Sequence, residues 1–427
     1  MSARRVLRCA RSLAVTVATV ATLTVCTGCE RSAPAAQPQA AQPLGPQTPP
    51  PVVAPVTPAP SAPAPAPVEP AAQAGRSAAE HAIALLSEQL ATPAGDPENP
   101  WALAHGLLAF GKDYETSDGR SAVLVAASYA ERKSGPKPRY GFPLERGGKP
   151  VEPHSHLLLK TFLEIGLPPS FSFTASDGAK IDLRRLLGDM RASVHEPTSD
   201  AEWHDAAWWL SALELRPVAG EPDLARVREA ALARLEADDA VLAEAGADAP
   251  EPFAASAPMG AAKRNKSHIY GHPCGGLHFV QAVLRGASAS RDAAAHTRVR
   301  RQLALLLRRY QAERGLYAET LRAHPEARLL VSGQELKFFG HLLETLALAD
   351  ELGLLREDAA LAEQVTAARL RATSDLLRTL SQLEQERAYA RLAELGVQRP
   401  QLALDLIGDG CHALHGLRET LAVLPER

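Results

Sequence analysis

Apolar side chains recur at helical spacing through most of the chain after about residue 76. One example is the series Leu224, Val227, Ala231 and Leu235, which places a single apolar stripe on one helix face. Between residues 356 and 395, apolar positions alternate with Glu and Arg, as expected of long amphipathic helices. One short run, Phe171 to Thr174, is typical of a strand. The pattern therefore predicts an all-α region with about twelve to fourteen helices.

Several of these helices carry chemical start signals. A capping box places Ser or Thr three residues before Glu or Gln, and two such pairs are Ser199 with Glu202 and Ser332 with Glu335. Proline is tolerated in the first turn of a helix, because the backbone N–H that it lacks has no helical partner there. Prolines at such positions are Pro100, Pro153 and Pro273. We expect a helix to begin at each of these five places.

The first residues have the pattern of an export signal. A basic head, residues 1–11, precedes an apolar run over residues 13–25, which is too short for the roughly 20 residues of a membrane span. The residues before Cys29 resemble the lipobox of bacterial lipoproteins. That resemblance implies acylation of Cys29 and, because Glu30 follows it, anchoring in the outer membrane. Cys26 replaces the usual Leu of the motif, so cleavage by signal peptidase I remains an alternative.

The next segment differs sharply in composition. Fourteen of the 34 prolines lie between Ala33 and Ala72, in a stretch with a single charge, Glu69. Such a chain cannot form a packed core and samples extended conformations. The sequence therefore predicts a signal peptide at 1–28, a lipidated cysteine with a disordered linker at 29–75, and one all-α domain at 76–427.

Composition and charge narrow the classes of partner. With 46% hydrophobic and 22% charged residues, the chain can bury a large core. Its formal net charge of −3 argues against nucleic acid, which is recognised mainly through positive charge. The expected partners are the membrane, through the lipid anchor, and a glycan or another envelope component.

A histidine followed by an apolar run recurs six times, at intervals of 48 to 74 residues, each sufficient for one helical hairpin. The six positions are His105, His156, His204, His278, His341 and His415. Six hairpins predict an (α/α)6 toroid, with an irregular α-solenoid as the alternative. In this layout the chain resembles the six-hairpin barrels of polysaccharide lyases, glycoside hydrolases and lanthionine cyclases.

In a toroid the inner helices direct their first turns toward one cavity. We therefore expect the histidines to converge on a pocket lined by His105, His156, His341, Trp203 and Trp208, where imidazole could act as a ligand, base or hydrogen-bond donor. The alternative is that each histidine fills a helix interface and is satisfied by backbone carbonyls.

Two of the six positions also carry a cysteine four residues earlier, on the same helical face. Cys274 with His278 and Cys411 with His415 could supply a Cys2His2 tetrahedron for zinc, with His412 as a spare ligand. Pro273 would place Cys274 in the first helical turn, where the helix dipole favours thiolate. Cys274 and the Cys411-His412 pair are also similar to the zinc ligands of lanthionine cyclases.

Two alternatives to a metal site use the same cysteines. Cys274 and Cys411 are the only cysteines after residue 29, and an exported protein meets oxidising conditions that favour a disulfide. Closing so long a loop would stabilise the fold by about 5 kcal/mol on the chain-entropy model. The second alternative is a pair of unpaired buried thiols.

A second candidate site needs no metal. Asp200, Glu202, His204 and Asp205 cluster at one helix start beside Trp203, Trp208 and Trp209. Carboxylates near aromatic platforms are typical of glycan hydrolysis, so the candidate catalytic residues are His204, Asp200 and Asp205 here and His278 in the metal site. The alternative is that Glu202 closes its capping box and the tryptophans fill the core.

These features predict an exported, lipid-anchored protein with a histidine-lined pocket, acting as a lyase or hydrolase on envelope or extracellular glycans. No catalytic motif is complete. The alternative function is a non-catalytic lipoprotein that binds a ligand or partner and uses its helical domain as a scaffold.

Overall fold

The computed structural model describes residues 68–135, 138–216, 222–240, 256–290 and 292–424. The predicted signal peptide, the acylated Cys29 and most of the predicted linker lie outside these residues. Helix α1 begins at Val68, eight residues before the boundary predicted at residue 76. The helical region therefore includes the end of the segment assigned to the linker.

The described residues form a mostly helical protein, which confirms the all-α prediction. Fourteen α-helices are present in this part of the chain, and none of them is long and apolar enough to cross a membrane. The helices are α1 (Val68–Leu90), α2 (Pro100–Phe110), α3 (Ala122–Ala127), α4 (Leu157–Glu164), α5 (Leu183–Arg191), α6 (Asp200–Leu215), α7 (Pro222–Asp238), α9 (Ser256–Arg264), α10 (Leu277–Ala289), α11 (Ala293–Ala323), α12 (Arg328–Glu351), α13 (Ala359–Gln385), α14 (Leu392–Gln398) and α15 (Pro400–Val423).

Three short antiparallel ribbons lie between the early helices. Strand β1 (Glu131–Lys133) pairs with β2 (Arg139–Gly141), and β3 (Glu145–Arg146) pairs with β4 (Lys149–Pro150). Strand β5 (Ser172–Thr174) pairs with β6 (Lys180–Asp182), so the strand predicted from Phe171 to Thr174 is present. In the first ribbon Lys133 lies directly opposite Arg139.

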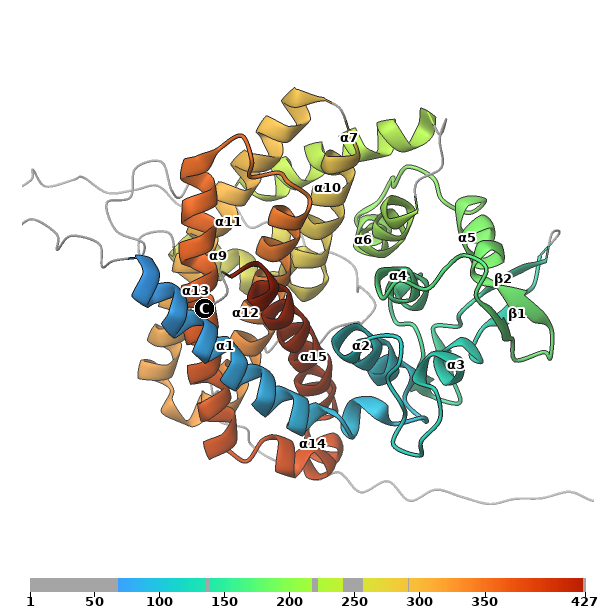
Figure 1. Cartoon of the computed structure of the whole chain (residues 1–427), viewed down its shortest axis with the longest axis horizontal. Helices are drawn as coiled ribbons and strands as arrows, with labels where there is room; N and C mark the ends of the chain where they lie inside the picture. Colours follow the sequence, from blue (N-terminus) through green and yellow to red (C-terminus); the bar gives the residue numbers. More distant parts are fainter. Residues whose placement is uncertain (1–67, 136–137, 217–221, 241–255, 291, 425–427) are drawn as a thin grey trace, which may run out of the picture.

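The six helices associated with the repeated histidines contact one another in a fixed order. Helix α2 contacts α4, α4 contacts α6, and α6 contacts α10. Helix α10 contacts α12, α12 contacts α15, and α15 returns to α2. These helices surround the middle of the view in Figure 1, with α3, α5, α7, α11 and α13 farther out. Their shared core is built mainly from Leu and Ala.

The closest of these contacts joins α12 to α15 and depends on glycine. A Cβ on Gly340 would lie 2.9 Å from the backbone of Ala413, and a Cβ on Gly416 would lie 2.8 Å from the backbone nitrogen of Glu344. Side chains at either position would push the helices apart. This close approach brings the polar residues of the two helices together.

The predicted helix starts are only partly realised. Ser199 and Glu202 form a complete capping box at α6, and Pro100 opens α2. Ser332, however, lies inside α12, which begins at Arg328, and its buried hydroxyl donates to Gln382. Pro153 precedes the first residue of α4 by four positions. Local signals at these last two positions were overridden by tertiary packing.

Candidate metal centre

Four histidine rings from four helices meet in the interior. His105 comes from α2, His278 from α10, His341 from α12 and His412 from α15, and all four are buried. The ring centres of His341 and His412 are 4.0 Å apart, and those of His278 and His341 are 4.6 Å apart. His105 lies 5.2 Å from His412. Three of the six repeated histidines therefore converge, whereas the repeat predicted that all six would.

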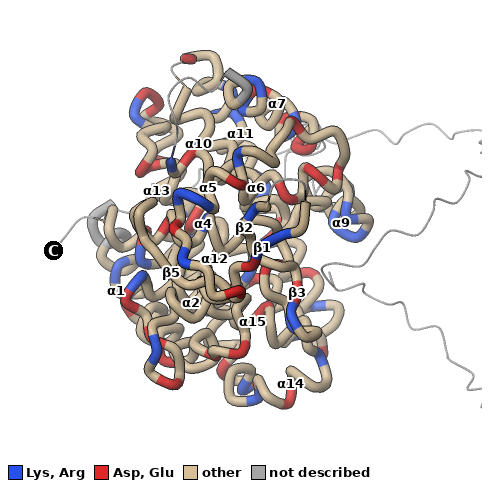
Figure 2. Tube along the Cα trace, turned by 90° about the vertical axis from the view of Figure 1, so that its right-hand side faces the viewer, with Lys and Arg blue, Asp and Glu red and all other residues tan. Residues whose placement is uncertain are grey.

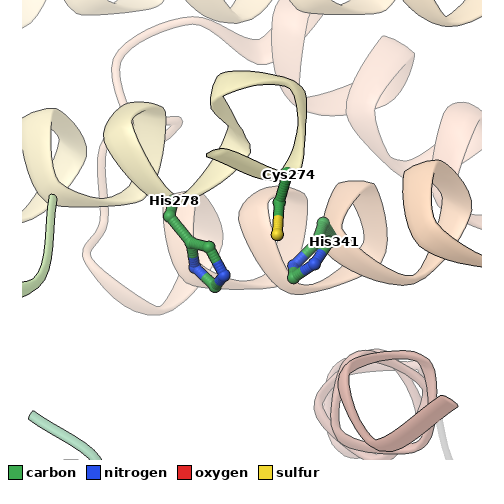
Figure 3. A group of neighbouring side chains, drawn as sticks. All are labelled: Cys274, His278 and His341. Atoms are coloured by element: carbon green, nitrogen blue, oxygen red, sulfur yellow. The ribbon is translucent and has the colours of Figure 1, made fainter. Parts of the chain in front are cut away.

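Two groups within this cluster could hold a metal ion. The ligand atoms of Cys274, His278 and His341 all lie within 4.8 Å of one another, and so do those of His341, Glu344 and His412. Figure 3 shows the first group, in which the sulfur and both rings point into the same space. Cys274 is only partly buried, whereas the histidines are buried. A soft sulfur with two imidazoles is a ligand set that suits zinc and similar transition metals.

A distorted turn positions Cys274. Three consecutive residues, Cys274, Gly275 and Gly276, have φ values of 52°, 62° and 82°. Left-handed backbone at a residue with a side chain costs about 1–3 kcal/mol and is concentrated at functional sites. Pro273 opens a short 3-10 turn, Pro273–Gly276, that contains Cys274, but α10 begins only at Leu277, so Cys274 is not in the first turn of an α-helix as predicted. The turn sets the direction of the sulfur instead.

Both glycines of this turn are required by close packing as well as by conformation. A Cβ on Gly275 would lie 2.8 Å from an Nη atom of buried Arg309. A Cβ on Gly276 would lie 2.5 Å from the side chain of Ile269. Larger residues would therefore displace Cys274 from the histidines.

Glu344 is the hub of the surrounding hydrogen bonds. Its carboxylate accepts from Nδ1 of His412 at 2.9 Å, from Nδ1 of His415 at 3.0 Å and from Nδ1 of His341 at 3.2 Å. Burial would raise the pKa of Glu344, but His412 and the other two histidines hold it well below its usual range. Nε2 of both His341 and His412 is left buried without a hydrogen-bond partner. A carboxylate that fixes one ring nitrogen and frees the other is typical of metal-binding histidines.

Electrostatics keep most of these rings neutral. Burial, followed by the repulsion of neighbouring rings, lowers the pKa of His278 well below its usual value. Burial also lowers the pKa of His412 to about 3 and that of His105 to about 4. For His341, burial opposes protonation, but Cys274, Asp409 and Glu344 outweigh it and raise the pKa. Neutral imidazole offers the lone pair that a metal needs.

Lys337 and Asp409 add a charge pair at the same place. Nε2 of His341 lies 3.6 Å from a carboxylate oxygen of Asp409, and Lys337 lies 3.1 Å from Asp405 and 3.5 Å from Asp409. Burial raises the pKa of Asp409, but Lys337 and His341 lower it overall. Sequence reasoning missed Glu344, Asp409 and Lys337. The signals that could have revealed them are two polar stripes at helical spacing: Lys337, His341 and Glu344 on one helix, and Asp405, Asp409 and His412 on the other.

The structure does not bring all four predicted zinc ligands together. Cys411 is completely buried, belongs to neither group, and has its pKa raised by burial. His415 binds Glu344 rather than joining Cys274 and His278. His412, treated as a spare ligand from the sequence, is the residue of this segment that lies against His341 and belongs to one of the two groups. Both cysteines are free, so the alternative Cys274–Cys411 disulfide is not formed.

The acidic residues at the start of α6 are each used locally. Asp200 forms an ion pair with Arg234 at 2.8 Å, and Asp205 accepts from the hydroxyl of Ser155 at 3.1 Å. Glu202 closes the capping box, and hydrogen bonds, first from the backbone of Thr198, lower its pKa to about 2. These carboxylates do not converge on a common space.

Among the other predicted residues of this region, Trp208 contacts the four-histidine cluster, with its ring centre 5.2 Å from that of His278. His204 is half-buried, and its ring lies 5.5 Å from that of His272. Trp203, Trp208 and Trp209 are buried, and Trp208 stacks on His154 with ring centres 4.1 Å apart. His156 occupies the position before α4 without a side-chain capping bond, and it lines a separate cavity.

Comparison with known proteins adds no assignment to this geometry. No protein-family model matches the chain, and neither the curated proteins nor the solved structures contain a match.

Proposed function

We propose that the chain is a zinc-dependent enzyme, a hydrolase or lyase, with the ion held by Cys274, His278 and His341. The observation that carries this proposal is that the ligand atoms of one cysteine and two histidines lie within 4.8 Å of one another, with the cysteine held in a left-handed turn. Catalytic zinc sites typically use three protein ligands and keep one position open. The partial exposure of Cys274 supports access to that position.

The surrounding residues suit this role. Glu344 holds Nδ1 of His341 and so directs Nε2 toward the ion, while the same carboxylate orients His412 beside it. Lys337 and Asp409 place one positive and one negative charge next to the ligands. When bound, zinc would polarise a substrate oxygen or activate a water molecule.

The finer architecture and the cellular setting belong to the same proposal. Each of the six helices α2, α4, α6, α10, α12 and α15 contacts the next, and the last contacts the first. This closed ring of contacts supports an (α/α)6 toroid whose centre contains the histidine cluster. We propose that the domain is exported, anchored through Cys29 in the outer membrane, and acts on envelope or extracellular glycans. The alternative remains a non-catalytic lipoprotein that binds a ligand or partner.

Cobalt substitution tests the metal site directly. The full chain, purified without chelators, should contain about one equivalent of zinc, and its cobalt form should show a sulfur-to-cobalt charge-transfer band. Cys274→Ser should abolish that band, because it removes the sulfur ligand. Cys411→Ser is the matched control and should retain it, because Cys411 lies outside both groups. Loss of the band in Cys411→Ser alone, or a Cys274–Cys411 disulfide in the exported protein, would overturn the proposal.

The same cobalt protein distinguishes an enzyme from a scaffold. Added cyanide should shift the visible bands of the cobalt ion if a coordination position is open, as a catalytic site requires. Unchanged bands would indicate a closed, structural site and would favour the non-catalytic alternative.

A further inference from the structure

A cavity of about 580 Å³ lies away from the metal centre, between the β1–β2 ribbon, the start of α4 and helix α5. Its size falls within the range of small-molecule sites. Figure 2 looks onto this side of the molecule, with β1 and β2 near the middle of the view. None of the residues that line the cavity belongs to either metal-binding group.

Two unpaired cations line this cavity. Lys133 and Arg139 are directly opposite each other in the ribbon, where like charges destabilise the pairing. Other cations nearby are neutralised, since Arg146 lies 3.6 Å from Glu131 and Arg185 lies 2.8 Å from Asp189. Within the described part of the chain, neither Lys133 nor Arg139 forms a salt bridge, although the charge of Lys133 acts on buried Glu152. The fold therefore concentrates positive charge at one end of the cavity.

A glycine helps to place one of these cations. A Cβ on Gly141 would lie 2.9 Å from Cε of Lys133, so the lysine stem lies across the backbone at that point. Both Gly141 and Lys133 line the cavity. The absence of a side chain at residue 141 leaves room for the end of the Lys133 side chain at the cavity wall.

The acidic groups of the cavity do not cancel this charge. Glu152 is 2% exposed, and burial raises its pKa to about 8, so its carboxyl is mostly protonated at neutral pH. It accepts a hydrogen bond from the backbone of Leu158 at 2.9 Å. Burial, and then Lys133, lowers the pKa of His156 to about 4, which keeps that ring neutral. Asp189 is already paired with Arg185.

The remaining wall is apolar. Phe142, Leu159, Leu186 and Met190 line it, beside the polar groups of Ser155 and His156. We propose that this cavity binds a small organic carboxylate, whose charged end pairs with Lys133 and Arg139 and whose body packs against Leu159 and Met190. Arginine matches a carboxylate through two parallel hydrogen bonds, and lysine adds a point charge.

Fluorescence titration of the full chain with dansylglycine tests this site. The probe carries a carboxylate on an apolar body, and its neutral amide is the matched control ligand. Dansylglycine should bind saturably with blue-shifted emission, and the amide should bind about tenfold more weakly or worse. In the double variant Lys133→Met/Arg139→Met, the affinity for dansylglycine should fall by about the same factor, and the affinity for the amide should not change.

Two control proteins complete the test. Arg132→Met removes an exposed cation of the same strand that does not line the cavity, and it should bind dansylglycine normally. Cys274→Ser should also bind it normally, because the metal group shares no residue with the cavity. Absence of saturable binding, equal affinity for acid and amide, or loss of binding in Cys274→Ser would each overturn the proposal. The last result would place the probe at the metal centre.

Discussion

The start of α6 and the interior between α10, α12 and α15 contain the same kinds of polar residue. The two regions differ in whether the polar atoms of those residues have hydrogen-bond or ion-pair partners. At α6, Asp200, Glu202 and Asp205 each have a local partner. In the interior, Nε2 of His412 is buried without one, and Nε2 of His341 makes no hydrogen bond and has only Asp409 at 3.6 Å. A buried polar atom without a partner costs about 1–3 kcal/mol. Missing partners, more than residue type, therefore distinguish a ligand site from a structural one.

The largest loss of stability should come from replacing Trp203, a residue predicted from the sequence to line a pocket. Trp203 is 8% exposed and packs edge-to-face on Phe279, with ring centres 5.7 Å apart. Trp203→Ala should lower the free energy of unfolding by about 3–5 kcal/mol, measured by urea denaturation, because it leaves a cavity in the core. Zinc bound per folded molecule should not change.

The adjacent residue provides the control. His204 is only half-buried, so His204→Ala should cost about 1 kcal/mol. If Trp203→Ala were as mild as His204→Ala, the indole would not be a core residue, and an aromatic platform at α6 would regain support.

The next effect concerns the hub of the interior. Glu344→Gln keeps the shape of the side chain but removes the charge that orients His341 and His412. Zinc affinity should fall by about 10–100-fold, as for other carboxylates behind metal-binding histidines. Competition with a chromogenic chelator would measure it.

Glu419→Gln is the matched control for this variant. Glu419 lies 3.8 Å from His415, and 45% of its side chain is exposed. Its replacement should change the zinc affinity by no more than about twofold, because exposed ion pairs contribute little. Equal affinities in the two variants would show that Glu344 does not support the metal ligands.

Much of the helical fold could be predicted from the chain. Apolar spacing predicted the number of helices, and the capping box at Ser199 fixed the start of α6. The same signal failed at Ser332, because the four residues before it already belong to a helix that packs on α13 and α15. Local sequence predicts a cap only where the tertiary structure leaves a helix end.

The candidate site was predictable in part. The repeat placed His105, His278 and His341 on helices that meet, since equivalent positions of repeated hairpins share one direction. Glu344 and Asp409 were missed because an acid on a Leu-rich helix is ordinarily a solvated residue. The direction of the Cys274 side chain could not be predicted from the sequence either, because it depends on three consecutive left-handed residues rather than on helical periodicity.

The smallest expected effect tests whether Glu202 at the start of α6 is a capping residue or a catalytic one. Ser199→Ala removes the hydroxyl that accepts from the backbone of Glu202, and it should cost about 1 kcal/mol in the free energy of unfolding, with zinc content unchanged. Glu202→Gln should keep most of the stability, because glutamine also completes a capping box. With its pKa lowered to about 2, Glu202 stays ionised near neutral pH and cannot serve there as a general acid. If turnover on the identified substrate were abolished by Glu202→Gln while stability was retained, the carboxylate would be catalytic and the contrast between the two regions would fail.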